Sequence, residues 1–211
     1  MSGKKISKAT IARLPLYLNT LRETHAKGEK YVSSSALAQS VLVSAVLVRK
    51  DLSLFTSVSG KPRKGFEVQR LIGDIEKFLG YDNLSDAVVV GAGGLGKAFL
   101  GYEGFKNNGL NILAAFDVAK ETVGLTIAGK SVYHISELER YIKENNVRIG
   151  IVAVPKTEAQ RVVDLMVGAG VKALWNFAAV ALKTPAEVVV KNEDLSASLA
   201  YLASELIRRG V

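Results

Sequence analysis

The spacing of apolar residues near the start of the chain predicts an amphipathic helix. Four of them recur at intervals of three and four, which gathers them on one helix face: Ile11, Leu14, Leu18 and Leu21. Ser7 stands where an N-cap is needed, and Gly28 ends the pattern. Pro15 falls inside it, so this proline either kinks one helix or begins a second.

Two shorter helices are expected next, joined by a brief turn. Ser33 and Ser34 belong to a serine run that can cap the first of them. Ser44 can cap the second, which we expect from Ala45 to about Phe55. Two short helices behind a longer one match the helix-turn-helix plan.

The second of these short helices separates two faces. Val48, Leu52 and Phe55 form its buried side. Its other side carries the residues that a recognition helix would turn towards bases and phosphates: Val46, Arg49, Lys50 and Ser53.

The segment from Thr56 to Phe66 combines turn residues with three cations. The cations are Lys61, Arg63 and Lys64. Glycine, proline and positive charge together predict a basic hairpin, the wing of a winged helix, lying along a sugar-phosphate groove. A helix over Val68–Leu79, with Leu71, Ile75 and Phe78 in step, closes this part of the chain.

A short apolar strand, Asp86–Val90, then runs directly into a glycine-rich loop. The loop has a GxGxxG pattern over six residues: Gly91, Ala92, Gly93, Gly94, Leu95 and Gly96. Gly91 allows the tight turn, Gly93 lets backbone amides approach a pyrophosphate, and Gly96 permits close helix–strand packing. The phosphates would lie at a helix N-terminus, where free N–H groups attract anions.

A second strand supplies the acidic residue that accompanies this loop in NAD sites. Leu110–Phe116 is apolar and ends at Asp117, which Val118 follows. A carboxylate roughly 20 residues beyond the loop accepts hydrogen bonds from ribose hydroxyls. It also repels a 2′-phosphate, so NAD (NADH and NAD+) is favoured over NADP(H).

Strands and helices go on alternating through the rest of the chain. We expect strands at Arg148–Val154, Val171–Phe177 and Glu187–Val190. A Ser136–Glu139 capping box opens one intervening helix, and Thr157–Val167 forms another. This alternation predicts a doubly wound parallel sheet with ligands at the strands' C-terminal ends. That rule adds four residues to the cofactor pocket: Val154, Pro155, Asn176 and Phe177.

The last predicted helix runs from an Asp194 cap to Arg209. Its apolar positions follow a narrow seam with intervals of four and three: Leu195, Leu199, Leu202 and Leu206. Such a seam either packs on the chain's own sheet or crosses to a second subunit. The seam alone leaves both open.

Charge divides the chain near residue 80. Residues 1–80 carry 14 Lys and Arg against 6 Asp and Glu, whereas residues 81–211 carry 14 of each. The first part therefore suits a polyanion and the second a dinucleotide. We predict an α/β protein with an N-terminal winged helix (helix-turn-helix) over 1–80 and a C-terminal Rossmann domain, a doubly wound parallel sheet, over 81–211.

Composition removes several other classes of function. The chain has no cysteine, which excludes disulfides, zinc–thiolate sites and thiol nucleophiles. We see no secretory signal and no apolar run of membrane-spanning length, so we expect a cytoplasmic protein without a membrane partner. His25 and His134 have no triad partner at recognisable spacing, so we expect no catalytic residue and no metal site.

Two alternatives stay open at this point. The chain could be a small NAD-dependent oxidoreductase whose basic part is an accessory module. It could instead bind DNA and respond to coenzyme A, although Asp117 favours a free ribose diol over the ribose phosphate of coenzyme A.

Nearly the whole chain resembles the Rex redox-sensing transcriptional repressors of bacteria. The resemblance is carried by these stretches: Lys5-Ile6-Ser7, Arg13-Leu14-Pro15-Leu16-Tyr17, Ser33–Ser35, Val48-Arg49-Lys50-Asp51-Leu52-Ser53, Gly65-Phe66-Glu67-Val68, Gly91–Gly96, Phe116-Asp117, Ala153-Val154-Pro155, Ala159-Gln160, Ala169-Gly170-Val171-Lys172 and Leu174-Trp175-Asn176-Phe177.

The resemblance implies a homodimer whose paired winged helices bind double-stranded operator DNA and release it when NADH binds. It also implies that the last helix is exchanged between subunits and that Phe177 lies near the nicotinamide. Two positions depart from the pattern. Leu47 replaces a usually polar residue in the recognition helix, and Ala179 replaces a proline after the Asn-Phe motif.

Overall fold

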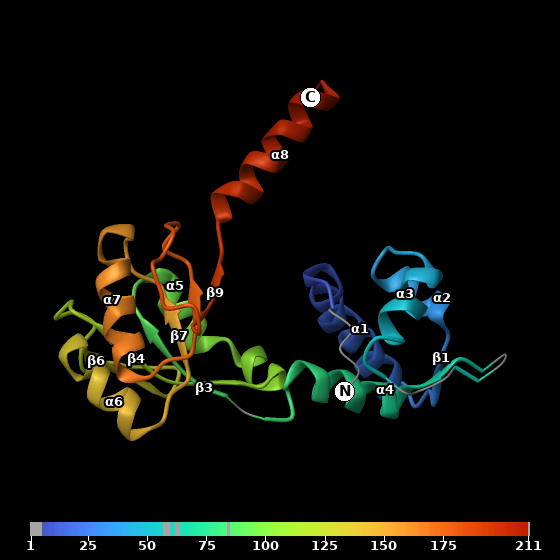
Figure 1. Ribbon diagram of the computed structural model, residues 1–211, viewed down its shortest axis with the longest axis horizontal. Coiled ribbons are helices and arrows are strands. Elements are labelled where there is room, and N and C mark those ends of the chain that lie inside the picture. Colours follow the sequence, from blue (N-terminus) through green and yellow to red (C-terminus); the bar gives the residue numbers. More distant parts are fainter. Residues whose placement is uncertain (1–5, 57–59, 62–63, 84, 211) are drawn as a thin grey trace. The chain divides into compact units, whose positions relative to one another are not determined.

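The chain separates into two compact units in the computed structural model, Met1–Asn83 and Leu84–Val211, which we call the head and the body (Figure 1). The structure describes residues 6–56, 60–61, 64–83 and 85–210. The break between the units falls a few residues after the step in charge at residue 80.

The head consists of four helices and a two-stranded antiparallel sheet among its described residues. Its elements in chain order are α1 (Lys8–Ala26), β1 (Tyr31–Val32), α2 (Ser34–Ser40), α3 (Ala45–Leu52), β2 (Phe66–Glu67) and α4 (Val68–Leu79). Strand β1 pairs with β2, with Val32 opposite Phe66. The helix-turn-helix of α2 and α3 thus lies beside a small sheet, which is the winged-helix arrangement.

Helix α1 is continuous and contains Pro15, so the interpretation of Pro15 as the start of a second helix is wrong. Ser7 caps it by accepting a hydrogen bond from the Thr10 N–H at 3.1 Å. Ile11, predicted on the buried face, is 42% exposed. The buried face consists of Thr10, Leu14, Tyr17, Leu18 and Leu21. Two of these residues, Thr10 and Tyr17, contact α3.

Both short helices begin at the predicted caps. The Ser33 hydroxyl accepts from the Ala36 N–H at 3.0 Å, and that of Ser44 accepts from the Leu47 N–H at 3.2 Å. Helix α3 ends at Leu52, before the predicted Phe55. The chain turns there, which brings the Phe55 ring to 5.2 Å from the Phe78 ring of α4.

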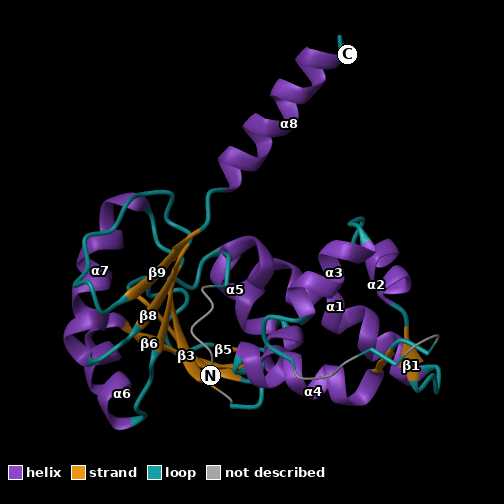
Figure 2. Ribbon diagram, turned by 45° about the vertical axis from the view of Figure 1, so that its right-hand side comes forward, coloured by secondary structure: helices purple, strands orange, loops and turns teal. Residues whose placement is uncertain are grey.

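The body is built around a seven-stranded sheet with the strand order β5-β6-β4-β3-β7-β8-β9 (Figure 2). The strands are β3 (Ser85–Val90), β4 (Leu110–Asp117), β5 (Thr126–Ile127), β6 (Lys130–His134), β7 (Ile149–Val152), β8 (Ala173–Asn176) and β9 (Val189–Asn192). All neighbours are parallel except β5 and β6. Leaving out the small β5, this is the order of a Rossmann sheet, with its switch point between β3 and β7.

Side chains of β3 alternate between two apolar cores, one on each face of the sheet. Val88 and Val90 pack with Leu138 and Val162, which come from α6 (Leu138–Glu144) and α7 (Lys156–Ala169). The opposite core, around Val89, includes Leu100 of α5 (Gly94–Gly101). Both cores converge on the end of β3 where the glycine loop begins.

Several predicted elements differ from the structure. The pattern missed β5 and β6, because β5 has only two residues and β6 has five, of which only Val132 is buried. The Ser136–Glu139 capping box is wrong: His134 caps a short 3-10 turn, η2 (Ile135–Glu137), through its ring nitrogen, and α6 follows with no side-chain cap. A second 3-10 turn, η1 (Glu103–Asn108), links α5 to β4.

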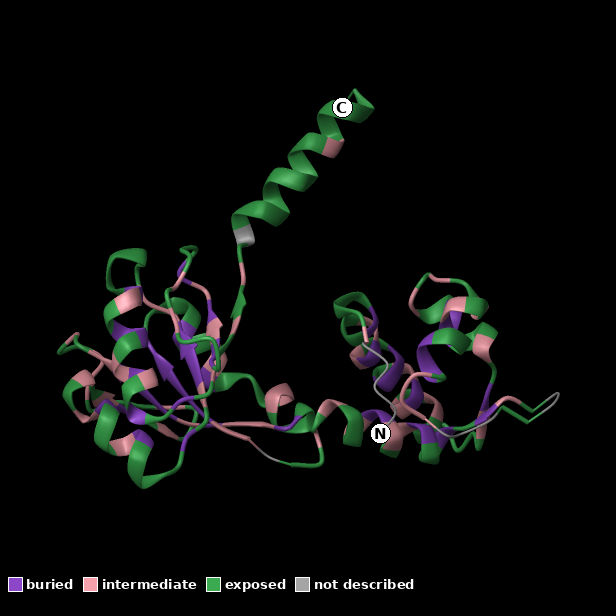
Figure 3. Ribbon diagram, in the orientation of Figure 1, coloured by how far each residue is buried: buried purple, intermediate pink, exposed green. Residues whose placement is uncertain are grey.

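Helix α8 (Leu195–Arg209) presents its apolar seam to solvent (Figure 3). Leu199, Leu202 and Leu206 are 68%, 58% and 53% exposed. No part of the described chain covers them, so the seam is not packed on the chain's own sheet. Among the described residues, no helix has the length and apolarity that crossing a membrane needs.

Candidate functional site

A cleft of about 350 Å³ opens in the body at the C-terminal ends of β3, β4 and β7. Six of the predicted cofactor residues line it: Gly91, Gly93, Asp117, Val118, Val154 and Pro155. The topology explains this convergence, because parallel strands on either side of the switch point end at the same edge.

Two glycines of the loop are required by the fold itself. Gly91 has a φ of +99°, and a Cβ there would lie 2.3 Å from the carbonyl oxygen of Ala153. A Cβ on Gly96 would lie 1.9 Å from the carbonyl oxygen of Gly91. These positions therefore have the predicted roles of a tight turn and close helix–strand packing.

The fold does not require glycine at the two positions between them, 93 and 94. A Cβ on Gly93 or Gly94 would meet nothing within 4 Å, and Gly93 has an ordinary φ of −70°. Both stand at the start of α5, which has no side-chain cap. Bare backbone beside uncapped N–H groups is the arrangement that admits a phosphate group.

Asp117 holds the loop next to this helix start. Its Oδ2 accepts a hydrogen bond from the Ala92 N–H at 2.6 Å, and its Oδ1 accepts from the N–H groups of Val118 and Ala119 at 2.7 and 2.9 Å. A carboxylate has about four acceptor positions, so the three hydrogen bonds leave about one of them open, and Asp117 lines the cleft. A ribose hydroxyl can occupy the open position.

The remaining cleft walls come from residues that were not predicted to line the cofactor pocket. The main additions are Val90, Phe116, Ile135, Ala153, Glu158, Arg161 and Val162. Arg161 pairs with Glu158 at 3.1 Å across one turn of α7. The spacing of three between opposite charges, directly after Pro155, was a usable signal for this pair.

Asn176 and Phe177 do not line this cleft. Asn176 is 1% exposed, and its side-chain amide donates to the carbonyl oxygen of Val180 and to Asn192 Oδ1, each at 2.8 Å. Its Oδ1 accepts from the Ala178 N–H at 3.0 Å. Asn176 thus does not line this cleft, and its hydrogen bonds to Val180 and Ala178 fix the loop that follows it.

The loop after Phe177 has Ala179 where the family that the sequence resembles usually has a proline. Ala179 has a φ of +48°, a value that proline cannot adopt. Phe177 belongs to a cluster of partly buried rings, 4.8 Å from both Phe99 and Trp175. This cluster lies on the α5 face of the sheet, away from α6 and α7.

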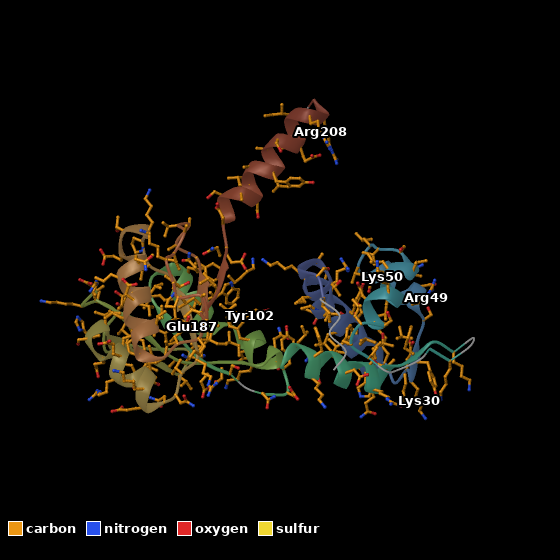
Figure 4. The ribbon with its side chains drawn as sticks, in the orientation of Figure 1. Lys30, Arg49, Lys50, Tyr102, Glu187 and Arg208 are labelled. Carbon is orange, nitrogen blue, oxygen red and sulfur yellow. The ribbon has the colours of Figure 1, made fainter. Side chains whose placement is uncertain are left out.

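The head presents the predicted recognition face to solvent. Val46, Arg49, Lys50 and Ser53 are all exposed. Figure 4 labels Arg49 and Lys50 on α3. The Arg49 guanidinium donates to the Ser34 hydroxyl at 2.9 Å, so α2 orients this cation and leaves its other N–H groups open.

A buried ion pair that the sequence analysis missed anchors the recognition helix. Asp51 is 2% exposed and receives hydrogen bonds from Arg13 (2.7 and 2.9 Å), Tyr17 (2.9 Å) and Thr10 (3.1 Å). Burial alone raises the pKa of Asp51, but these donors outweigh it and hold the pKa below its usual value. Burial, helped by Asp51, raises the pKa of Tyr17 to about 12.

The predicted wing is a tight basic turn where it is described. Lys61 and Gly65 form an antiparallel bridge, with the Lys61 N–H 2.8 Å from the Gly65 oxygen. The Nζ atoms of Lys61 and Lys64 lie 5.5 and 6.0 Å from the Tyr31 ring centre, a double cation–π contact. Arg63 lies outside the described residues.

A winged helix with exposed cations, followed by a Rossmann unit with a dinucleotide-type loop, defines a ligand-responsive transcription regulator. Comparison with known proteins agrees for each part. Residues 5–53 match the family described as "Putative DNA-binding protein N-terminus", and residues 82–180 match "CoA binding domain".

Full-length relatives carry one name. The Redox-sensing transcriptional repressor Rex of Treponema denticola is 41% identical over 96% of this chain and 96% of its own. That of Desulforamulus reducens is 43% identical over 98% of each. The chain therefore belongs to the Rex family of redox-sensing transcriptional repressors; its relatives are named as repressors, not enzymes.

Solved structures agree in sequence and fold. The Rex-family repressor RSP in complex with beta-NAD+ and operator DNA is 35% identical, with a TM-score of 0.91 over 98% of this chain and 95% of that one. RSP in complex with beta-NADH is 34% identical, with a TM-score of 0.85 over 98% and 97%.

Proposed function

We propose that this chain forms a homodimer that binds double-stranded operator DNA through its heads and releases it when NADH binds in its bodies. One observation carries the proposal. Two loop glycines, Gly93 and Gly94, have no role in the fold, yet they stand in a chain whose head exposes Arg49 and Lys50. A dinucleotide accounts for the glycines and a polyanion for the cations.

The nucleotide would lie along the cleft with its pyrophosphate on the first turn of α5. Gly91–Gly96 would supply backbone N–H groups, and Asp117 would accept from the adenosine ribose. Val118, Val154 and Pro155 would line the adenosine end. Phe177 would lie on the nicotinamide side. Asn176 holds the loop that follows Phe177.

The ligand could instead be coenzyme A, because the body matches a family described as a CoA binding domain. The Asp117 carboxylate favours NAD(H), since coenzyme A carries a phosphate on its adenosine ribose and would be repelled. The RSP complexes with beta-NAD+ and beta-NADH support the same choice.

DNA contacts would come from three places on the head. Ser44, Ala45, Val46, Arg49, Lys50 and Ser53 would enter the major groove, while Ser33 and Ser34 would face the backbone beside it. Lys61, Arg63 and Lys64 would follow a neighbouring groove. A protein that acts on operator DNA in a bacterium works in the cytoplasm.

Dimerisation would use the exposed seam of α8. Its three described leucines cannot stay in water without cost, since each fully buried leucine side chain is worth about 1.5–3 kcal/mol. A second copy offers an apolar face in return, the partly buried rings of Phe99, Phe105 and Trp175. Mutual exchange of α8 would satisfy both surfaces.

NADH would act by favouring the dimer arrangement that cannot bind DNA. A ligand shifts such an equilibrium only by its difference in affinity for the two states. Couplings of about 1–3 kcal/mol change DNA affinity about 5- to 150-fold.

The test is fluorescence anisotropy of the full chain on an operator duplex, titrated separately with NADH, NAD+ and coenzyme A. We expect NADH alone to release the DNA. Equal responses to NADH and NAD+ would exclude redox sensing, and a response to coenzyme A alone would establish the second candidate. Steady NADH consumption with a substrate would instead indicate an oxidoreductase.

A further inference from the structure

The DNA-facing side of α3 contains an apolar residue at the position where base contacts concentrate. Val46 is 66% exposed and lies three and four residues before Arg49 and Lys50. Residues at these spacings are neighbours on a helix surface. Val46 therefore shares one face with the two cations, at the N-terminal end of the helix.

A second apolar side chain is exposed just before this helix. Leu42, in the turn between α2 and α3, is 93% exposed and has a φ of +55°. Its N–H bonds the Gln39 oxygen and the Val43 N–H bonds the Ala38 oxygen, which is the Schellman ending of a helix. Glycine is the usual residue at this position, because it adopts a positive φ without strain.

Neither side chain contributes to the folding of the head. Leucine at position 42 adds backbone strain and leaves its apolar surface in water, and Val46 is also outside the core. Both choices disfavour the isolated domain. The fold of the head therefore does not explain either side chain, whereas a partner on the recognition face would.

We propose that Val46, together with Leu42 in the preceding turn, contacts the C5-methyl group of thymine and so makes this protein select a dT at a fixed position in each half-site. The thymine methyl is the apolar feature of the major groove, and aliphatic side chains are its usual contacts. This inference rests on the proposed binding of operator DNA. The cations Arg49 and Lys50 would recognise guanine through hydrogen bonds. Those contacts cannot identify the thymine that Val46 would select.

Replacing dT by dU removes only this methyl group and leaves every hydrogen-bonding atom in place. Burying one methyl-sized group is worth about 0.8 kcal/mol, a factor of about 4 in affinity. Symmetric substitution in two half-sites should therefore cost about 15-fold. We expect this loss at one or more dT positions for the wild-type chain.

The probe is a duplex selected by the full chain from randomised DNA, with each symmetric dT pair replaced by dU in turn. V46A should bind the unmodified duplex about 15-fold more weakly and lose less than about twofold on dU substitution. V189A is the matched control, because Val189 is a valine of similar exposure, 68%, on β9 of the body. It should behave as the wild type.

L42G separates recognition from folding. Glycine relieves the strain at this position, so the melting temperature of the head should rise by a few degrees while affinity for the dT duplex falls. A purely structural role would move stability and affinity in the same direction.

Two results would overturn the proposal: no dU substitution weakens the wild-type complex, or V46A and the wild type lose equally at every position. In either case the selected duplex is still bound, so the proposed DNA binding stands. If randomised DNA yields no preferred sequence and binding is insensitive to salt, the proposed function itself fails.

Discussion

Removal of the Asp51 carboxylate should destabilise the head and weaken DNA binding without affecting the body. In Asp51→Ala, the Tyr17 hydroxyl loses its acceptor inside the protein, the Thr10 hydroxyl keeps only the Ser7 hydroxyl at 3.0 Å, and Arg13 loses its ion-pair partner. Breaking a buried pair costs about 3–5 kcal/mol, and leaving a buried polar group unpaired costs about 1–3 kcal/mol. Arg13 is 21% exposed and can recover some hydration, so we expect a loss of about 3 kcal/mol.

This loss is large for a unit of this size, whose stability should be about 4–12 kcal/mol. The matched control is Glu76→Ala, which breaks the Arg22–Glu76 pair between α1 and α4 at 2.8 Å. Its partners are 34% and 31% exposed, so the cost should be below about 1 kcal/mol.

The single tryptophan allows the two units to be followed separately. Trp175 lies on β8 of the body, so its fluorescence reports unfolding of the body alone. Far-UV circular dichroism reports the helices of both units. In urea, Asp51→Ala should shift an early dichroism transition and leave the fluorescence transition unchanged. Equal effects of the two substitutions, or a shifted fluorescence transition, would refute the assignment of Asp51 as the anchor of α3.

The direction of each pKa shift predicts how the same network responds to pH. The pKa of Asp51 is lowered in the folded head, so its stabilisation is complete above the unfolded pKa of about 3.9 and is lost as pH falls below it. The pKa of Tyr17 is raised to about 12, so stability is retained below pH 10 and lost between about 10 and 12. Asp51→Asn should flatten the acid limb of a stability–pH profile.

Four substitutions test the two sites and their loops. Asp117→Ala should weaken NADH binding about 10- to 100-fold in a fluorescence titration and leave DNA affinity of the ligand-free protein nearly unchanged. Lys50→Ala should do the reverse and reduce the slope of log affinity against log salt by about 1 per half-site; loss of both activities in either variant would contradict the two-site division. Gly93→Ala should have a free energy of unfolding within about 0.5 kcal/mol of the wild type yet bind NADH poorly. A variant that does not fold would show that the fold needs this glycine. Ala179→Gly should raise the free energy of unfolding, followed by Trp175 fluorescence, by about 1 kcal/mol, because glycine relieves the strain of a φ of +48°.

Local signals in the sequence predicted most of the fold. The caps Ser7, Ser33 and Ser44 each accept a hydrogen bond in the structure, because capping involves only neighbouring residues. Gly91 and Gly96 were identified for the same reason, since the loop pattern encodes a local turn. The sequence placed Asp117 correctly because a strand end and a fixed spacing determine its position.

Errors arose where burial depends on distant partners. Asp51 is an acidic residue on an otherwise cationic helix, and its burial is made favourable by donors from a distant helix, chiefly Arg13, 38 positions earlier. The Ser136–Glu139 pattern predicted a capping box, but His134 provides the cap, because the β6 strand ends one residue before η2 begins. The place of Asn176 at a strand end predicts a pocket residue. Its side-chain amide instead makes hydrogen bonds to the following loop, whose conformation the sequence pattern does not encode.

The uncovered state of α8 has a consequence for the genetics of this regulator. The described side chains of α8 belong to neither core of the body, so a chain that stops at residue 193 should keep its nucleotide cleft while losing the seam that we propose holds the dimer together. A nonsense mutation in this stretch should therefore yield a stable, ligand-competent protein that never silences a promoter. Loss of repression would then also arise at codons after position 193, far from any codon for a proposed DNA contact.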